Sequence, residues 1–148
     1  MAFNVLIVDD SAVMRGMIAR VVRLTGLPLG AVYEAGDGAA GLAAAREHWV
    51  DLVLLDINMP VMDGEQMLRQ LRADPATAAT PVVVVSTEGS EARRAALEAL
   101  GVSFIRKPFK PEELRALIVQ ATGVTPDDEY YAGVPAGAAP DDDGALDF

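Results

Sequence analysis

Polar side chains that can do chemistry follow four apolar runs of this 148-residue chain, near the point where each run ends. They are Asp9 and Asp10 after residues 5–8, Asp56 after 52–55, Ser86 after 82–85, and Lys107 after 102–105. The carboxyl ends of parallel strands meet at one edge of an open α/β sheet, which is where such folds bind ligands. If the runs are neighbouring parallel strands, the five side chains gather at that edge.

Three carboxylates at one edge repel each other unless a cation lies among them. A pair 4 Å apart is unfavourable by about 1 kcal/mol in water and by about 4 kcal/mol at an effective dielectric constant of 20. An all-oxygen site favours Mg²⁺ or Mn²⁺, which often bridge a carboxylate to a phosphoryl group. A carboxylate can itself attack phosphorus, and Lys107 and Ser86 would stabilise the phosphoryl oxygens. The residues therefore predict metal-assisted phosphoryl chemistry.

The segments between these runs contain helical patterns. The predicted strands are residues 5–8, 31–35, 52–55, 82–85 and 102–105. The predicted helices are one that follows the N-cap Ser11 to residue 22, and others over 38–49, 63–73, 91–100 and 111–121. Such alternation forms a parallel sheet with helices on both faces, and right-handed crossovers leave an open doubly wound α/β fold.

Composition excludes several kinds of site. The chain has no cysteine and a single histidine, His48, which rules out thiol catalysis, disulfides and multi-histidine metal sites. We expect His48 to be a solvated residue near a helix C-terminus. The net charge of −10 argues against a protein that neutralises nucleic-acid phosphates. A dinucleotide-binding fold would need a glycine-rich turn where Asp9 and Asp10 stand, so that interpretation fails on charge.

Charge also divides the chain into two parts. Residues 1–122 hold 15 acidic and 12 basic residues, a net of −3, whereas residues 123–148 hold seven acidic residues and no basic one. We therefore predict one folded domain over 1–122 and an acidic tail rich in Gly, Ala, Pro and Asp over 123–148. No apolar stretch reaches the roughly 20 residues of a membrane span and no signal peptide is recognisable, so we expect a cytoplasmic protein.

Five segments, taken in order, match a known family. They are VLIVDDS at 5–11, DLVLLDINMP at 51–60, MDG at 62–64, VSTE at 85–88 and KPF at 107–109. Over residues 1 to about 122 the chain resembles the receiver domain of two-component response regulators, most closely the single-domain chemotaxis (CheY-like) type. The resemblance implies a flavodoxin-like (βα)5 fold with strand order 2-1-3-4-5.

The resemblance also implies roles for the residues at the strand ends. Asp56 is implied to be the phosphoacceptor, and Lys107 is implied to contact the phosphoryl group. The implied Mg²⁺ ligands are Asp10, Asp56 and the backbone carbonyl of Asn58, with Asp9 acting through water. The Lys107–Pro108 peptide bond is implied to be cis.

Two further pairs are implied to control the phosphorylated state. In the family, the hydroxyl at Ser86 moves towards the phosphoryl group and an aromatic ring at Phe104 turns inward. The chemotaxis type usually has tyrosine where this chain has Phe104, so a hydroxyl contact with the output partner is absent. Asn58 and Glu88 tune hydrolysis of the aspartyl phosphate, and this pair predicts a short-lived phosphoryl state.

The implied partners are proteins. A histidine kinase supplies the phosphoryl group, a phosphatase removes it, and a target binds the face built by the fourth helix, fifth strand and fifth helix. No nucleic acid, membrane or enzymatic activity on another substrate is expected. Residues 141–148 combine acidic and apolar side chains, and one hypothesis is that they compete with the target for this arginine-rich face.

Two other interpretations remain open at this stage. One is a degenerate receiver that never takes phosphate, against which the set Asp10, Asp56, Ser86 and Lys107 argues. The other is a haloacid-dehalogenase-like phosphatase, which also uses an aspartyl nucleophile. That family needs a second aspartate two residues after the first, where this chain has Asn58.

Overall fold

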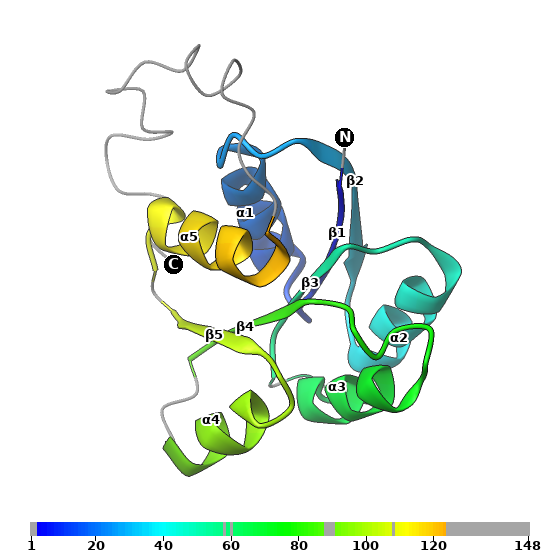
Figure 1. Ribbon diagram of the computed structural model, residues 1–148. Helices are drawn as coiled ribbons and strands as arrows, with labels where there is room; N and C mark the ends of the chain where they lie inside the picture. The colour runs from blue at the N-terminus through cyan, green and yellow to red at the C-terminus, as the bar shows by residue number, and fades with distance from the viewer. Residues whose placement is uncertain (1–2, 58, 60, 88–90, 108, 124–148) are drawn as a thin grey trace.

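Five parallel strands form one sheet with helices on both faces (Figure 1). The computed structural model describes residues 3–57, 59, 61–87, 91–107 and 109–123. The elements are β1 (Phe3–Val8), α1 (Ala12–Arg23), β2 (Leu29–Ala35), α2 (Gly38–Glu47), β3 (Leu52–Leu55), α3 (Gly64–Ala73), β4 (Val82–Ser86), α4 (Glu91–Glu98), β5 (Ser103–Arg106) and α5 (Pro111–Thr122). The strand order β2-β1-β3-β4-β5 confirms the expected flavodoxin-like fold.

The sheet separates two hydrophobic cores. Successive side chains of a strand point to opposite faces, so Val5 and Ile7 of β1 join the core beneath α1 and α5, while Leu6 and Val8 join the core beneath α2, α3 and α4. Every residue of β3 is buried. This two-sided burial explains why the central strands are continuous apolar runs with no polar alternation.

Polar side chains in the loops after β1 and β3 cap the helices that follow these strands. Ser11 Oγ accepts a hydrogen bond from the Met14 amide at 3.1 Å and begins α1, as predicted. Asp63 accepts from the Gln66 amide at 2.9 Å, and the Gln66 side chain accepts from the Asp63 amide at 3.1 Å. This reciprocal capping box begins α3 and makes Asp63 a helix cap.

The predicted helix over 38–49 ends two residues early, and His48 lies at its C-terminus, as expected, with a side chain that is only partly exposed. The helix α2 ends at Glu47, and His48 adopts an extended backbone as its C-cap. The half-buried His48 ring stacks on Tyr33 of β2, with ring centroids 4.1 Å apart and planes 10° apart. The stacking could not be predicted from the sequence because periodicity along one helix says nothing about a ring contact with another element.

Arg72, in the last turn of α3, links this helix to the turns that precede β4 and β5. Its guanidinium donates hydrogen bonds to the backbone carbonyl oxygens of Ala78, Thr80, Leu100 and Gly101, at 3.2, 2.7, 2.8 and 3.3 Å. Burial lowers the pKa of Arg72 because desolvation disfavours the charged form. The four carbonyl oxygens stabilise the charge in that half-buried position.

The predicted domain boundary lies at the end of α5. This helix ends at Thr122, and Gly123 follows it with a positive φ of 71° as the C-cap. Of the predicted acidic tail over 123–148, residues 124–148 lie outside the described residues. In the part of the chain that is described, none of the helices is long and apolar enough to cross a bilayer.

Candidate functional site

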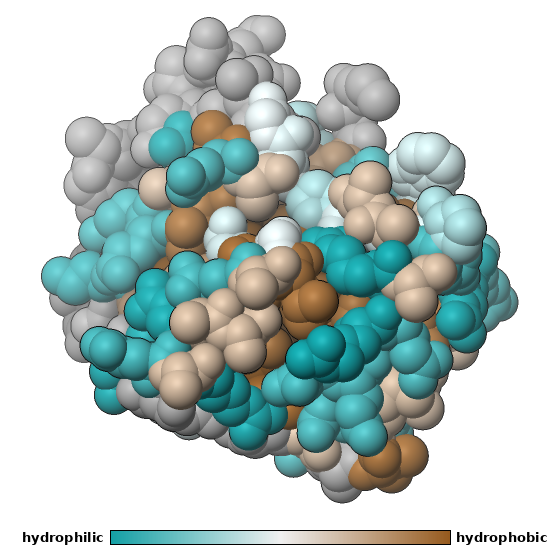
Figure 2. Space-filling model, turned by 60° about the horizontal axis from the view of Figure 1, so that its bottom comes forward, coloured by the Kyte–Doolittle hydropathy of each residue, from teal (hydrophilic) through white to brown (hydrophobic). Residues whose placement is uncertain are grey.

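Three carboxylates converge at the carboxyl edge of the sheet. Oxygen atoms of Asp9, Asp10 and Asp56 all lie within 4.8 Å of one another. Asp9 is only 2% exposed, Asp56 is half-buried and Asp10 is exposed to solvent. Figure 2 views this end of the molecule, where hydrophilic residues in teal surround a small group of hydrophobic residues in brown. The gathering of these three side chains, predicted from strand ends, is therefore observed.

Backbone hydrogen bonds hold two of these aspartates close together. The Asp56 amide donates to the Val8 carbonyl oxygen at 2.9 Å, and the Asp9 amide donates to the Ala35 carbonyl oxygen at 3.1 Å. Both bonds continue the parallel ladders beyond the strands, since Val8 is in register with Leu55 on one side and with Ala35 on the other. The backbone at Asp9 and Asp56 therefore cannot move apart without breaking the sheet edge.

Lys107 lies against the acidic cluster. Its ammonium Nζ is 3.3 Å from Asp9 Oδ2, and both side chains are largely buried. The Lys107 amide donates to the Ser86 carbonyl oxygen at 2.9 Å, which joins the exits of β4 and β5. Asp9 Oδ1 accepts from the Ser11 amide at 2.9 Å. Asp9 thus holds the ammonium and the start of α1 together at the edge where phosphoryl chemistry was predicted.

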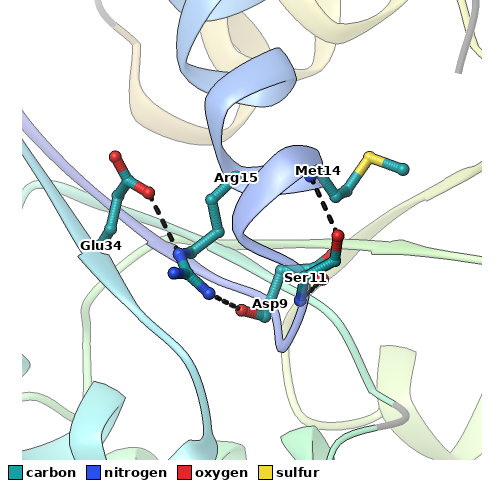
Figure 3. Close-up of polar contacts among 5 residues, drawn as sticks. All are labelled: Asp9, Ser11, Met14, Arg15 and Glu34. Carbon is teal, nitrogen blue, oxygen red and sulfur yellow. Dashed lines mark hydrogen bonds and ion pairs between the residues drawn. The ribbon is translucent and has the colours of Figure 1, made fainter.

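Arg15 was not singled out from the sequence, yet it contacts the site (Figure 3). Its Nη1 donates to the Asp9 carbonyl oxygen at 2.6 Å, and its Nε pairs with Glu34 Oε1 at 3.0 Å. The guanidinium therefore braces the end of β1 against β2. Its place one turn after Ser11 puts it near the site, but nothing in the sequence pairs it with Glu34, 19 residues away.

The loop after β3 approaches the site so closely that only glycine fits at position 64. A Cβ on Gly64 would overlap the Asp56 carbonyl oxygen and lie 2.8 Å from the Ile57 Cα. The Gly64 amide donates to the Ile57 carbonyl oxygen at 2.9 Å, which draws the start of α3 under Asp56. In the same loop Val61 has a φ of 67°, a strained conformation for a β-branched residue, and it is 84% exposed.

Ser86 and Phe104 occupy adjacent strands. Ser86 is fully buried at the end of β4, and Phe104 of β5 is 7% exposed, with its ring in the core beneath α4. The Arg94 guanidinium of α4 lies 4.9 Å from the centre of the Phe104 ring. Asn58, Glu88 and Pro108, to which metal-binding, hydrolysis-tuning and cis-peptide roles were assigned, lie outside the described residues.

The donor set fits a hard divalent cation. The three clustered groups offer carboxylate oxygens, which Mg²⁺ and Mn²⁺ prefer. Lys107 pairs with one of the three carboxylates, that of Asp9, and three carboxylates carry more negative charge than one ammonium group can neutralise. A divalent cation among the carboxylates would relieve their repulsion.

Comparison with known proteins agrees with this architecture. The curated relatives include the cyclic di-GMP phosphodiesterase response regulator RpfG of Xanthomonas campestris pv. campestris, 39% identical over 78% of this chain and 31% of its own length. This chain spans about a third to a half of the length of the curated relatives it matches.

Two solved structures align over nearly their whole length. CheY4 of Vibrio cholerae is 31% identical, with a TM-score of 0.73 over 82% of this chain and 99% of its own. The receiver domain of the sensor histidine kinase PA1611 of Pseudomonas aeruginosa, described with a magnesium ion in its active-site cleft, is 25% identical, with a TM-score of 0.72 over 83% of this chain and 99% of its own. Residues 5–119 match the response regulator receiver domain family, and the chain belongs to that family.

Proposed function

We propose that this receiver accepts a phosphoryl group on Asp56 from a histidine kinase and signals through a phosphorylation-dependent protein contact. A carboxylate oxygen of Asp56 forms the bond to phosphorus while the phosphorus–nitrogen bond of the kinase's phosphohistidine breaks. The protein acts on itself only, in this transfer and in the later hydrolysis. The single observation that carries the proposal is the convergence of Asp9, Asp10 and Asp56 beside Lys107.

Each residue at the edge has a part in this proposal. Asp10, Asp56 and the Asn58 carbonyl would hold Mg²⁺ directly, with Asp9 acting through water. The bound cation would supply charge neutralisation between the carboxylates and the phosphoryl oxygens. The Lys107 ammonium group, which donates to Asp9 Oδ2, would move to a phosphoryl oxygen. This movement would need only rotation about the bonds of its flexible side chain.

Switching would involve Ser86 and Phe104. Ser86 ends the strand next to Asp56, so its hydroxyl can donate to a phosphoryl oxygen there. Phe104 lies on the neighbouring strand with its ring already in the core. Phosphorylation would shift the population of this ring between an inward and an outward state. Asn58 and Glu88 would keep the phosphoryl state short-lived, and a radiolabelled phosphate that persisted for hours would contradict that part.

The output partner is proposed to bind the face of α4, β5 and α5, with no nucleic acid or membrane involved. The exposed basic residues Arg94, Arg106 and Lys110 belong to this face. The role would be that of a stand-alone, chemotaxis-like response regulator with a kinase, a target and a phosphatase as partners. Capture of binding proteins by the beryllofluoride-treated protein, compared with the untreated protein, tests for a phosphorylation-dependent target.

Intact-mass spectrometry after incubation with acetyl phosphate and Mg²⁺ tests the central step. The protein should gain about 80 Da, the mass of one phosphoryl group, and EDTA should prevent the gain. The Asp56→Asn variant should gain nothing, whereas the matched control Asp63→Asn, which changes a helix cap at the same edge, should gain the same mass.

The same experiment separates the other interpretations. No mass gain in the wild-type protein would indicate a degenerate receiver. Continuous release of phosphate from several phosphomonoesters would indicate a phosphatase. Modification of Asp56→Asn to the wild-type extent would overturn the assignment of the phosphoacceptor.

A further inference from the structure

A groove lies between the end of α1 and the start of β2, at the end of the sheet opposite to the acidic cluster. It has a volume of about 470 Å³ and is lined by Arg23, residues 26–30 and Val32. Its place is fixed by the sheet, because Leu29 at the start of β2 pairs with Phe3 at the start of β1. In Figure 1 this region is at the top, where α1 leads into β2. We call it the α1–β2 groove.

The lining of the α1–β2 groove combines apolar side chains with the positive charge of Arg23. Leu27 and Leu29 contribute apolar surface, and the neighbouring Leu24 is 42% exposed. Residues 11–33 contain three arginines and no acidic residue. Of these arginines, Arg15 pairs with Glu34, whereas the exposed Arg23 makes no hydrogen bond or ion pair with the residues that the structure describes. The groove therefore suits an occupant that is both acidic and apolar.

We propose that residues 141–148 of the same chain dock in the α1–β2 groove. This segment reads DDDGALDF, with four aspartates and the apolar Leu146 and Phe148. It belongs to a stretch, residues 123–148, with seven acidic residues and no basic one. Leu146 and Phe148 would pack against Leu27, Leu29 and Val32, and the aspartates would complement the charge of Arg23.

The point at which the chain leaves α5 is within reach of the groove. Arg115 Nε of α5 donates to the Thr25 carbonyl oxygen at 3.1 Å, and Thr25 adjoins the groove residue Gly26. Gly123 follows Arg115 by eight residues. At the helical rise per residue this places Gly123 within roughly 20 Å of Thr25.

The linker has a suitable length for that span. Seventeen residues separate Gly123 from Asp141. A flexible linker of that length has a root-mean-square end-to-end distance of about 23 Å. Effective concentration is highest when this distance matches the span, and it then reaches the millimolar range for short linkers. A contact between the segment and the groove with a dissociation constant below about 1 mM would therefore be mostly formed within one molecule.

This placement differs from the arginine-rich face of α4, β5 and α5 that the sequence suggested for the same segment. On that face Arg93 lies 3.9 Å from Glu65, and Arg94 lies 3.5 Å from Glu98 and over the Phe104 ring. Docking there would have to displace these contacts. Docking beside Arg23 displaces no contact among the described residues, so the α1–β2 groove is favoured.

Paramagnetic relaxation enhancement in the full-length chain tests the proposal. The chain has no cysteine, so Ala145→Cys provides a single attachment point for a nitroxide spin label. The amide signals of Arg23, Leu27, Gly30 and Val32 should lose most of their intensity in the oxidised sample and recover on reduction of the label. A mixture of labelled ¹⁴N protein and unlabelled ¹⁵N protein should show no such loss.

Two substitutions identify the contacts. Arg23→Glu should restore most of the groove signals, whereas the control Arg106→Glu, which reverses an exposed charge on β5, should leave the losses unchanged. Replacing Leu146 and Phe148 together with serine should also restore the signals. The losses of groove signals should persist in the Asp56→Asn variant, because the groove is remote from the phosphorylation site. The test of docking is therefore independent of the proposed function.

Each other outcome overturns the proposal. Losses that also occur in the mixed sample would assign the groove to a second copy of the chain. Losses confined to α4, β5 and α5 would assign the segment to that face instead. Absence of losses on any described element would show that residues 141–148 do not dock.

Discussion

The Asp10→Asn substitution should make the metal-free protein more stable, although it removes a charge from the proposed metal site. Oxygen atoms of Asp9, Asp10 and Asp56 lie within 4.8 Å of one another. At that distance each carboxylate pair is unfavourable by about 0.9 kcal/mol in water and about 3.5 kcal/mol at an effective dielectric constant of 20. Asp10 is exposed, so the aqueous value applies more closely. Two such pairs predict a gain of about 1–2 kcal/mol in the free energy of unfolding.

Magnesium should reverse the order of stability of the wild-type protein and the Asp10→Asn variant. A ligand that binds only the folded state adds about 2.7 kcal/mol to the free energy of unfolding at 100 times its dissociation constant. The wild-type protein should gain this stabilisation, whereas Asp10→Asn, with one carboxylate fewer, should gain much less. The variant should therefore be the more stable protein in EDTA, and the wild type should be the more stable protein in Mg²⁺.

Urea unfolding followed by far-ultraviolet circular dichroism measures both effects. Tryptophan fluorescence is a poor probe here because Trp49 is already 79% exposed in the folded protein. The control Glu47→Gln removes an exposed carboxylate of α2 outside the cluster and should change the free energy of unfolding by less than about 0.5 kcal/mol. A sodium chloride series at equal ionic strength separates binding from screening. A less stable Asp10→Asn protein in EDTA, or equal responses of variant and wild type to Mg²⁺, would refute the reasoning.

Three substitutions test how the structure supports the site, each by urea unfolding. Gly64→Ala should lower the free energy of unfolding by about 1–3 kcal/mol because its methyl group would overlap the backbone at Asp56. The control Gly16→Ala, which places its methyl group in open space, should raise the free energy of unfolding by up to about 1 kcal/mol. Arg72→Met should lower it by about 1.5–3 kcal/mol because four hydrogen bonds to backbone carbonyl oxygens, three of them partly buried, are lost. An unchanged midpoint would contradict that role. Asp63→Ala should lower the free energy of unfolding by about 1 kcal/mol because the capping box is lost. Asp63→Ser should recover most of that stability, and a failure to do so would argue against capping.

The fold could be predicted because its elements follow from local features. The four residues 52–55 are all apolar, and the structure buries each of them in the middle of the sheet. Ser11 and Asp63 were recognisable as caps because a cap needs only a short polar side chain before a helical pattern. The acidic cluster followed from the same logic, since strand ends in a parallel sheet share one edge.

The contacts of the long charged side chains could not be predicted in this way. Lys107 pairs with Asp9, 98 residues earlier in the chain, and Arg15 pairs with Glu34 across two elements. Neither pair leaves a trace in periodicity or composition, because several rotatable bonds let such side chains choose among neighbours that only the folded structure defines. The stacking of His48 on Tyr33 also left no signal, because periodicity within α2 does not report a ring contact with β2.

The three carboxylates of the acidic cluster repel one another, and the backbone prevents them from moving apart. The amides of Asp9 and Asp56 are bonded to the carbonyl oxygens of Ala35 and Val8, so separating the carboxylates would break the sheet edge. Lys107 pairs with one of the three carboxylates, that of Asp9. The repulsion among the three groups can be relieved by a bound cation, by protonation or by loss of a charge through substitution. The same three side chains therefore lower the stability of the metal-free protein and raise its affinity for a cation. Such a conflict is expected at a functional site.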